Sequence, residues 1–228
     1  MVKKSDDIAS GQQFVRDALE IGALELVPEG RALKNGRISP YFFNSGLFNS
    51  GAYSPALGRA FASAIRSSGV RYSTLYGPPY KGFGIVIPAA EMLAKMKLPN
   101  TYVMSRKEAK DHGEGGVLIG AKDFKGQRVL ILDDVITDGG TKREAVELIT
   151  SLHGALAGLV VAFDRSEWRE ESTRRSAAEE FERDFNVPVI KVADVHDLIA
   201  VLEKGANENE LWARAFPKIL AYQKKYGV

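Results

Sequence analysis

The stretch Arg128–Thr141 reads RVLILDDVITDGGT and joins an apolar run to two adjacent carboxylates and a glycine-rich tail. The apolar run predicts a buried strand from Val129 to Val135, and the apolar spacing beyond it predicts a helix from Thr141 to His153. Asp133 and Asp134 therefore lie at the carboxyl end of a strand, just before a helix begins. In open parallel sheets, ligands bind beyond this end of the strands.

The residues after the acids suit an anion. The first N–H groups of a helix are unpaired, and the helix dipole favours negative charge there. Gly139 and Gly140 let the backbone approach a ligand closely, while Thr137 and Thr141 add hydroxyl donors. A sugar phosphate matches the whole stretch, because its hydroxyls donate to carboxylates and its phosphate accepts from backbone amides.

Other interpretations of this stretch remain open. Paired acids at a strand end can also cap the next helix or bind a metal, and receiver domains of response regulators gather aspartates at strand ends. In receiver domains the acid pair belongs to the first strand, whereas here it lies past mid-chain. Motifs for other nucleotide sites are missing, since neither GxxxxGK[ST] nor a strand followed by GxGxxG occurs.

Composition narrows the class of protein. The chain has 228 residues and a net charge of +2, which fits a single domain over 1–228 and gives no electrostatic reason to expect nucleic acid or an anionic membrane. It has no cysteine, which fits a reducing compartment. The N-terminal MVKKSDDIAS lacks the apolar stretch of a signal peptide, and no apolar run is long enough to span a bilayer. We expect a cytoplasmic protein with no membrane and no nucleic-acid partner.

The order of predicted elements indicates an α/β fold. An N-terminal helix over 11–22 precedes short strands in 23–44, with turns at 28–30 and 35–36. The later predicted helices are 54–68, 82–96, 141–153, 176–186, 195–204 and 209–226, and the strands are 73–76, 101–105, 117–121, 129–135, 156–163 and 189–192. Pro88 should bend or start its helix and Pro217 interrupt the last one, while 165–175 reads as a charged surface loop. Alternating strands and helices predict a mainly parallel twisted sheet flanked by helices.

Four stretches together resemble one family. LILDDVITDGGT is similar to the phosphoribosyl-diphosphate motif of type I phosphoribosyltransferases. SPYFFNSGLFNSG from Ser39, GPPYKG from Gly77 and SRKEAKDHGEGG from Ser105 narrow the resemblance to the orotate phosphoribosyltransferases. Two positions depart from the family pattern: Pro79 stands where Ala is frequent, and Asp138 places a negative charge beside the phosphate loop.

The resemblance implies a type I phosphoribosyltransferase fold with a small hood formed mainly by residues 1–50. Such an enzyme transfers the 5-phosphoribosyl group from phosphoribosyl diphosphate to orotate, giving orotidine 5′-monophosphate and pyrophosphate in pyrimidine (UMP) biosynthesis. Mg²⁺ would be required and would arrive bound to substrate and water, with no direct protein ligand. In the family a mobile loop closes over the neighbouring subunit's site, which implies a homodimer with a catalytic loop shared across subunits.

The resemblance also implies a set of site residues. The residues expected to bind phosphoribosyl diphosphate are Lys34, Tyr80, Lys81, Arg106, Lys107, Lys110, His112, Asp133, Asp134, Val135, Ile136, Thr137, Asp138, Gly139, Gly140 and Thr141. Those expected to bind orotate are Lys34, Phe42, Phe43, Thr137 and Arg165. The expected catalytic set is Arg106, Lys107, Lys110, His112, Asp133 and Asp134.

The residue types suit this chemistry. Substitution at an anomeric carbon builds positive charge on the sugar and negative charge on the departing diphosphate. Four cationic or potentially cationic side chains within 106–112 can stabilise that leaving group, and the glycines at 113, 115 and 116 would let the loop close. Taken alone, the same loop is an ordinary charged hairpin tip, Phe42 and Phe43 are two core residues, and Asp164–Arg165 is a surface pair.

Two rival functions use the same fold. One is a transferase with another acceptor, such as a purine base. Orotate carries a carboxylate, and Lys34 and Arg165 supply cations for it. The other is a regulator that binds the sugar diphosphate without catalysis. Such a protein should lose the loop cations or gain a nucleic-acid module, and this sequence shows neither change.

Overall fold

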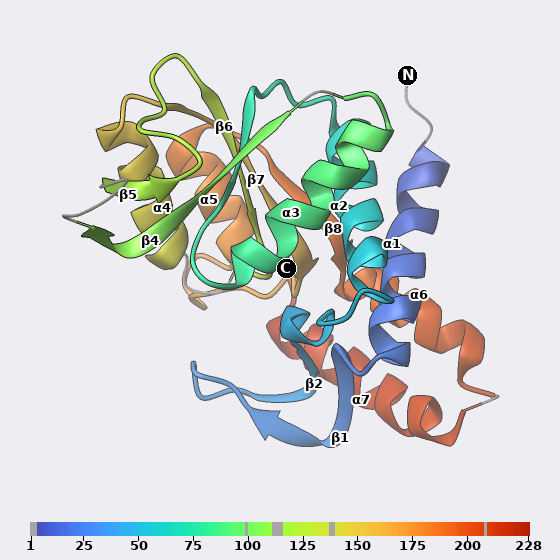
Figure 1. Cartoon of the computed structure of the whole chain (residues 1–228). Helices are drawn as coiled ribbons and strands as arrows, with labels where there is room; N and C mark the ends of the chain where they lie inside the picture. The colour runs from blue at the N-terminus through green and yellow to red at the C-terminus, as the bar shows by residue number, and fades with distance from the viewer. Residues whose placement is uncertain (1–3, 99, 111–115, 137–139, 208) are drawn as a thin grey trace.

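The computed structural model describes residues 4–98, 100–110, 116–136, 140–207 and 209–228. Figure 1 shows a twisted central sheet with helices on both faces and a separate hairpin at one end. The strands are β1 Leu24–Ala32, β2 Ile38–Phe43, β3 Thr74–Gly77, β4 Thr101–Lys110, β5 Gly116–Ile119, β6 Arg128–Asp133, β7 Ala155–Asp164 and β8 Val189–Asp194. The helices are α1 Lys4–Glu20, the 3-10 helix η1 Ser45–Leu47, α2 Ser54–Ser68, α3 Lys81–Lys95, α4 Gly140–Ser151, α5 Ala177–Phe185, α6 Val195–Gly205 and α7 Glu210–Tyr226.

The main sheet has the strand order β5-β4-β3-β6-β7-β8. All neighbouring pairs are parallel except β4 and β5, which pair antiparallel at one edge. From β3 the chain proceeds through α3 to β4 on one side, and from β6 it proceeds through α4 to β7 on the other. The direction of winding therefore reverses between β3 and β6. In such sheets the ligand crevice lies at this switch point, beyond the carboxyl ends of the strands.

Strand β6 shows why this sheet is covered on both faces. Leu130 and Leu132 belong to one apolar core with α1, α2, α3 and α6, whereas Val129 and Ile131 belong to a second core with α4 and α5. Successive side chains of a strand point to opposite faces, so a continuous apolar run is what a strand between two helical layers requires. The predicted mainly parallel α/β fold is confirmed, with β5 as an antiparallel exception.

The N-terminal hairpin, which we call the hood, consists of β1 and β2 paired antiparallel. The turn predicted at 28–30 is wrong, because β1 continues through Pro28 and Gly30 with an irregular register between Leu26 and Arg31. A strand that has only one partner tolerates proline, which lacks a backbone N–H, and a bulge absorbs the extra residues. The turn at Asn35–Gly36 is present, and Gly36 adopts a positive φ of 80°.

The predicted interruption at Pro217 is wrong, and Pro88 does not mark the start of its helix. Pro88 lies inside α3 and Pro217 inside α7, and both helices continue through them. Pro88 is buried within α3. Helix α2 packs tightly against this point, because a Cβ on Gly58 would clash with the Pro88 carbonyl oxygen.

Strand β4 is longer than predicted and changes the setting of the cationic segment. The expected strand ended at Ser105, but β4 continues to Lys110 and forms a hairpin with β5. Arg106 and Lys107 therefore lie on a strand. Among the helices that the structure describes, none is long and apolar enough to cross a membrane.

Candidate active site

An ion pair at the switch point connects the segments that follow β3 and β6. Lys81, the first residue of α3, places Nζ 2.6 Å from Oδ2 of Asp134, which follows the end of β6. The lysine side chain is about half exposed, whereas the aspartate side chain is only 8% exposed. The crevice expected from the topology is thus lined by a reachable cation on one side and a largely buried carboxylate on the other.

Asp133 is held by a different lysine. Nζ of Lys142, in the first turn of α4, lies 2.5 Å from Oδ2 of Asp133, and the two side chains are 10% and 8% exposed. The other oxygen of Asp133 accepts the backbone N–H of Asp134 at 2.8 Å. Burial raises the pKa of Asp133 and the charge of Asp134 adds to this, while Lys142 works in the opposite direction. Without the lysine, an ionised Asp133 would be a buried charge with one hydrogen bond.

Asp134 is oriented by its own backbone and by the hood. Its Oδ1 accepts the Val135 N–H at 2.8 Å, and Ser45 Oγ donates to its Oδ2 at 3.5 Å. Ser45 opens η1, directly after β2. The SPYFFNSG stretch therefore reaches Asp134 through its second serine, Ser45.

The turn between β3 and α3 brings backbone into close contact. A Cβ built on Gly77 would lie 2.6 Å from the Gly82 carbonyl oxygen, so neither end of the GPPYKG turn leaves room for a side chain. Tyr80 within it is 66% exposed, and Lys107 Nζ lies 5.2 Å from the centre of its ring. The structure thus brings Tyr80, Lys81 and Lys107 to the same side of the crevice.

Some of the remaining predicted residues in the β4–β5 hairpin and the phosphate loop are described by the structure and others are not. Arg106 Nη1 donates to the Leu118 carbonyl across the hairpin at 3.0 Å. Ile136 is buried in the second core, and Gly140 and Thr141 begin α4 in exposed positions. The predicted site residues His112, Thr137, Asp138 and Gly139 and the side chain of Lys110 lie outside the part of the chain that the structure describes.

A second cluster of charges lies at the end of β7. Asp164 accepts both the N–H and the hydroxyl of Ser166 at 3.0 Å, and Lys191 on β8 places Nζ 2.5 Å from its Oδ2. Arg165 does not pair with Asp164. Its nearest anion is Glu167, at 2.7 Å, and its Nη2 donates to Ser39 Oγ at 2.7 Å. The alternative of an Asp164–Arg165 surface pair is therefore wrong.

Glu167 joins three parts of the chain that are distant in sequence. Besides Arg165, it pairs with Arg37 of the hood at 3.0 Å and accepts the Tyr222 hydroxyl of α7 at 3.1 Å. Its side chain is 8% exposed, and those of Arg37 and Arg165 are 11% and 12% exposed. The expectation of a charged surface loop at 165–175 is thus wrong for its first residues, which are enclosed by the hood and α7.

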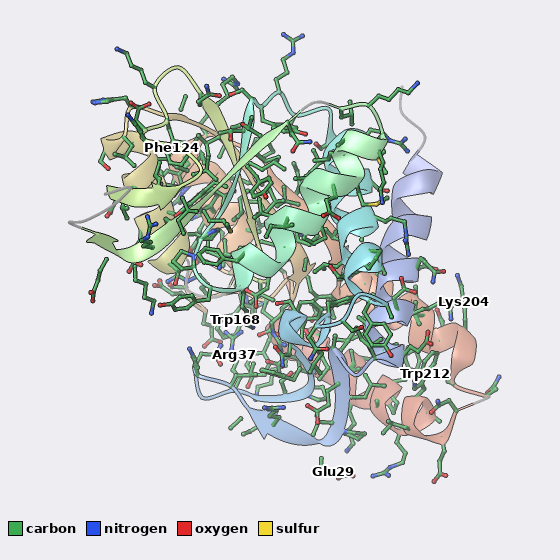
Figure 2. The ribbon with its side chains drawn as sticks, viewed as in Figure 1. Glu29, Arg37, Phe124, Trp168, Lys204 and Trp212 are labelled. Carbon is green, nitrogen blue, oxygen red and sulfur yellow. The ribbon has the colours of Figure 1, made fainter. Side chains whose placement is uncertain are left out.

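Aromatic rings complete this cluster. The Arg165 guanidinium lies 4.2 Å from the centre of the Tyr41 ring, and that of Arg37 lies 4.2 Å from Trp168 and 4.5 Å from Tyr226. Figure 2 shows Arg37 and Trp168 side by side where the hood meets the main body. Planar guanidinium groups stack favourably on aromatic faces, so the rings stabilise charges that burial would otherwise disfavour.

The predicted base-binding residues are only partly brought together. Phe43 is a core residue whose ring stacks on Phe163 at 5.5 Å, whereas Phe42 is half-buried beneath the Arg31 guanidinium at 4.0 Å. The structure separates the two rings onto opposite faces of β2. Lys34 is exposed in the hood turn.

Sequence reasoning missed four residues that contact predicted ones: Lys142, Ser39, Ser45 and Glu167. Lys142 carried a usable signal. It lies three residues before Ala145 and seven before Ile149, so helical periodicity puts it on the buried face of α4, where a lysine needs a counter-ion. Ser39 and Ser45 contact predicted residues far away in sequence, whereas Glu167 lies two residues from Arg165 but is also held by the distant Arg37 and Tyr222.

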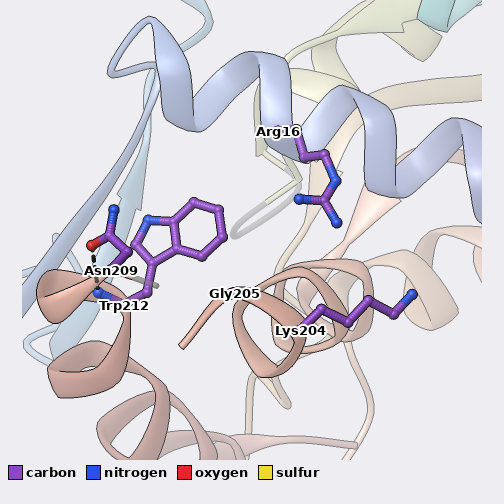
Figure 3. Close-up of a pocket in the computed structure, with 5 residues that line it drawn as sticks. All are labelled: Arg16, Lys204, Gly205, Asn209 and Trp212. Carbon is purple, nitrogen blue, oxygen red and sulfur yellow. Dashed lines mark hydrogen bonds between the residues drawn. The ribbon is translucent and has the colours of Figure 1, made fainter. Parts of the chain in front are cut away.

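A cavity of about 390 Å³ lies apart from these strand-end residues, between α1, α6 and α7. It is lined by Arg16, Lys204, Gly205, Asn209 and Trp212 (Figure 3). Asn209 caps α7 through the Trp212 N–H, and Lys204 points away from the indole and donates to Gln12. The polar side chains of Asn209 and Lys204 in this cavity thus serve a helix end and a surface contact.

The described residues contain no group of three or more His, Asp or Glu side chains that could hold a metal ion. Both strand-end acids at β6 face lysines, at 2.5 and 2.6 Å. A divalent cation at this place would have to displace a lysine from a carboxylate. The donor set fits a metal that arrives with its own phosphate and water ligands.

Comparison with known proteins gives consistent results. The profile of the phosphoribosyl transferase domain matches residues 52–190. The chain is 45% identical over 212 residues to an orotate phosphoribosyltransferase of Stenotrophomonas maltophilia, covering 93% of this chain and 91% of the relative. It is 45% identical over 217 residues to that of Nitrosococcus oceani, covering 95% and 94%. A crystal structure of the Francisella tularensis orotate phosphoribosyltransferase superposes with a TM-score of 0.80 at 34% identity, covering 95% of this chain and all of that one.

Proposed function

The chain belongs to the orotate phosphoribosyltransferases of the phosphoribosyltransferase family, and we propose that its β6 and β7 strand ends divide the two substrates between them. The enzyme transfers the 5-phosphoribosyl group of phosphoribosyl diphosphate to orotate, giving orotidine 5′-monophosphate and pyrophosphate in pyrimidine biosynthesis. The observation that carries the proposal is the Lys81–Asp134 contact across the switch point.

The β6 end receives the phosphoribosyl diphosphate. Asp133 and Asp134 accept hydrogen bonds from the ribose hydroxyls, since an ionised carboxylate has about four acceptor positions and each acid uses only some of them here. The loop Val135–Thr141 holds the 5-phosphate at the start of α4, where backbone N–H groups and the helix dipole favour an anion. This segment begins where the two acids end, so one short stretch contacts both ends of the ribose phosphate.

Cations around the crevice hold the diphosphate. Lys81 and Lys107 lie on the same side of the crevice, with Lys107 Nζ 5.2 Å from the centre of the Tyr80 ring, and Arg106, Lys110 and His112 belong to the same hairpin as Lys107 in sequence. In the transition state, charge moves onto the leaving diphosphate, and fixed cations stabilise that charge more than they stabilise the ground state. The chain thus needs no proton transfer at the sugar. Its contribution is alignment and charge stabilisation.

The β7 end receives orotate. Arg37 and Arg165 carry two positive charges and Glu167 one negative charge, so the enclosed group has a net charge of +1. A base that carries one carboxylate neutralises this net charge, whereas an uncharged base leaves the enclosed group with its charge of +1. Arg165 makes the carboxylate contact in this proposal, and Phe42, Phe43, Thr137 and Lys34 complete the pocket.

Mg²⁺ accompanies the diphosphate. It supplies charge neutralisation on the phosphate oxygens, and its preference for phosphate and water fits a site in which lysines face both acids. No residue of this chain is proposed as a direct ligand.

The proposal also covers the domain organisation of the chain and its assembly into a dimer. The chain is a single domain with residues 1–50 as its main hood, it acts as a homodimer, and the β4–β5 hairpin serves the partner's site in a cytoplasmic enzyme. In Figure 1 this hairpin projects from the edge of the sheet, which suits a contact with a second copy. Mixing the inactive variants Lys110→Ala and Asp134→Asn tests the shared site. Restored activity supports it, and activity no higher than that of either variant contradicts it.

The function is tested by following orotate absorbance in the presence of phosphoribosyl diphosphate and Mg²⁺. The wild type should consume orotate, and Lys107→Ala should lose about 100-fold or more in kcat because a cation at the leaving group is removed. Turnover of another base but not of orotate would show that the other base is the acceptor substrate. Binding of phosphoribosyl diphosphate without turnover of any base would favour a regulator.

A further inference from the structure

The two adjacent acids at the end of β6 have different kinds of partner. Asp134 faces Lys81, whose side chain is about half exposed and which begins a neighbouring helix. Asp133 faces Lys142, whose side chain is 10% exposed and packed in the first turn of α4. One cation can be drawn away by a diphosphate in the crevice, and the other is held by the fold.

We propose that Lys142 is a positioning residue for the phosphoribosyl-diphosphate site and acts entirely through Asp133. The buried pair fixes the Asp133 carboxylate with one oxygen on Lys142 and the other on the Asp134 N–H. It thereby sets the direction in which the chain leaves β6 towards the phosphate loop. This inference rests on the proposed function of the β6 end. It adds Lys142, which lies just outside the LILDDVITDGGT stretch and was not among the predicted site residues.

Charge explains why a lysine is needed at this place. Asp133 and Asp134 are neighbours in the chain, and both side chains are 8% exposed. Two buried carboxylates so close disfavour each other's ionised form, and one of them becomes protonated unless a cation is near. If Lys81 moves to the diphosphate, Lys142 is the cation that keeps the pair ionised, so that both acids can accept from ribose hydroxyls.

The same chain contains a matched control. Asp164 at the end of β7 also has a lysine partner at 2.5 Å, Lys191, whose side chain is 37% exposed where that of Lys142 is 10% exposed. Asp164 accepts from Ser166 rather than from the backbone that leads into the phosphate loop. Lys191→Met therefore removes the cation from a strand-end aspartate without touching the β6 end.

The experiment compares Lys142→Met, Lys142→Arg and Lys191→Met. We expect Lys142→Met to lower kcat/KM for phosphoribosyl diphosphate about 10- to 100-fold, the usual effect of losing a hydrogen bond to a charged group. We expect Lys142→Arg to recover most of the loss and Lys191→Met to stay within about twofold of wild type for this substrate.

A pH profile separates positioning from general damage. The titratable groups that interact with Asp133 are Lys142, Asp134 and the phenol of Tyr76. Loss of Lys142 removes the lowering influence on the pKa of Asp133, so the acid limb of kcat/KM for phosphoribosyl diphosphate should move to higher pH in Lys142→Met and stay in place in Lys142→Arg. If Lys142→Met does not fold, Lys142→Gln keeps a donor without the charge, and the same movement is expected.

Equal kcat/KM and equal acid limbs in Lys142→Met and Lys191→Met would overturn the inference while leaving the proposed function intact. If the wild type does not turn over orotate, the proposed function fails, and calorimetric titration with phosphoribosyl diphosphate alone still decides the role of Lys142. Weaker binding in Lys142→Met than in Lys191→Met would support it, and equal binding would contradict it.

Discussion

The ends of β6 and β7 both bear a buried aspartate with a lysine 2.5 Å away, yet they are built from different parts of the chain. At β6, the partners of the acids are Lys81 and Lys142, which begin the helices on either side of the switch point. At β7, the charges following the strand are held by the hood and by α7, up to 131 residues away in sequence. The acids at the first end are contacted mainly by lysines in the first turns of α3 and α4, together with Ser45 after β2, whereas the charges at the second end are enclosed by the hood and α7.

This difference has a functional meaning in the proposed enzyme. A site made by strand ends and helix starts is fixed once the sheet has formed, and it serves the phosphoribosyl group that every member of the superfamily uses. A site made by the hood and α7 can change without disturbing the sheet. The acceptor base, which differs between members, is proposed to bind there.

The largest effect on stability is expected from Glu167→Gln. The change leaves two enclosed guanidinium groups, those of Arg37 and Arg165, without their carboxylate. Removing one partner of a buried ion pair costs about 3–5 kcal/mol, which for a chain of this size lowers Tm by roughly 6–20 °C. Thermal unfolding followed by circular dichroism measures the shift.

The matched control for Glu167→Gln is Glu29→Gln. Glu29 also links the hood to α7, through Arg214, but both side chains are more than half exposed. An exposed ion pair contributes about 0–1 kcal/mol, so this variant should unfold within about 4 °C of the wild type. Similar shifts in the two variants would show that the Glu167 cluster is no more important than a surface contact.

A smaller effect, on one substrate only, is expected from Arg165→Lys. Lysine keeps the charge but loses the planar fork that contacts Glu167 and Ser39 and stacks on Tyr41. We expect KM for orotate to rise about tenfold, with KM for phosphoribosyl diphosphate nearly unchanged. An orotate saturation curve measures it. A larger change for the diphosphate than for orotate would assign Arg165 to the other substrate.

The smallest effect is expected at a third strand end, that of β8. Asp197 and Asp194 form the capping box of α6 with no lysine among their described contacts. Burial, with the charge of Asp194, raises the pKa of Asp197 to about 6. The folded state therefore binds a proton between pH 4 and 6 that the unfolded state does not, and the stability from this group is lost as pH rises through that window.

Asp197→Asn should remove this dependence. Above pH 6 the variant should be more stable than the wild type by about 1 kcal/mol, a value kept small because solvent reaches the half-buried group. Below pH 4 the two proteins should be equally stable. Urea unfolding at pH 4 and pH 7 tests it, and an unchanged difference between the two pH values would contradict the assignment.

The sequence predicted the β6 strand end better than the β7 strand end. The strand-end position of Asp133 and Asp134 came from an apolar run followed by a helix pattern, both of which are local signals. The depth of Arg165 and Glu167 was missed because the RSEWREESTRR stretch is charged, and only packing against the hood and α7 encloses its first residues. Lys142 lies between these cases, since helical periodicity places it inward but only the structure identifies Asp133 as its partner.

The backbone expectations failed for a related reason. A turn was predicted at Pro28 and an interruption at Pro217, yet β1 and α7 continue through them, and Pro88 lies inside α3 rather than at its start. Local propensity is a weak guide where the surroundings compensate, as they do in β1, which has a single strand partner.

The central claim, that the β6 end holds phosphoribosyl diphosphate and the β7 end holds orotate, is tested most directly by one kinetic experiment. Initial rates of orotate consumption are measured over a grid of both substrates for the wild type, Asp134→Asn and Arg165→Lys. The account predicts opposite defects: Asp134→Asn should lose about 100-fold in kcat/KM for phosphoribosyl diphosphate with KM for orotate nearly unchanged, and Arg165→Lys should show the reverse pattern. Equal defects for both substrates in both variants would contradict it.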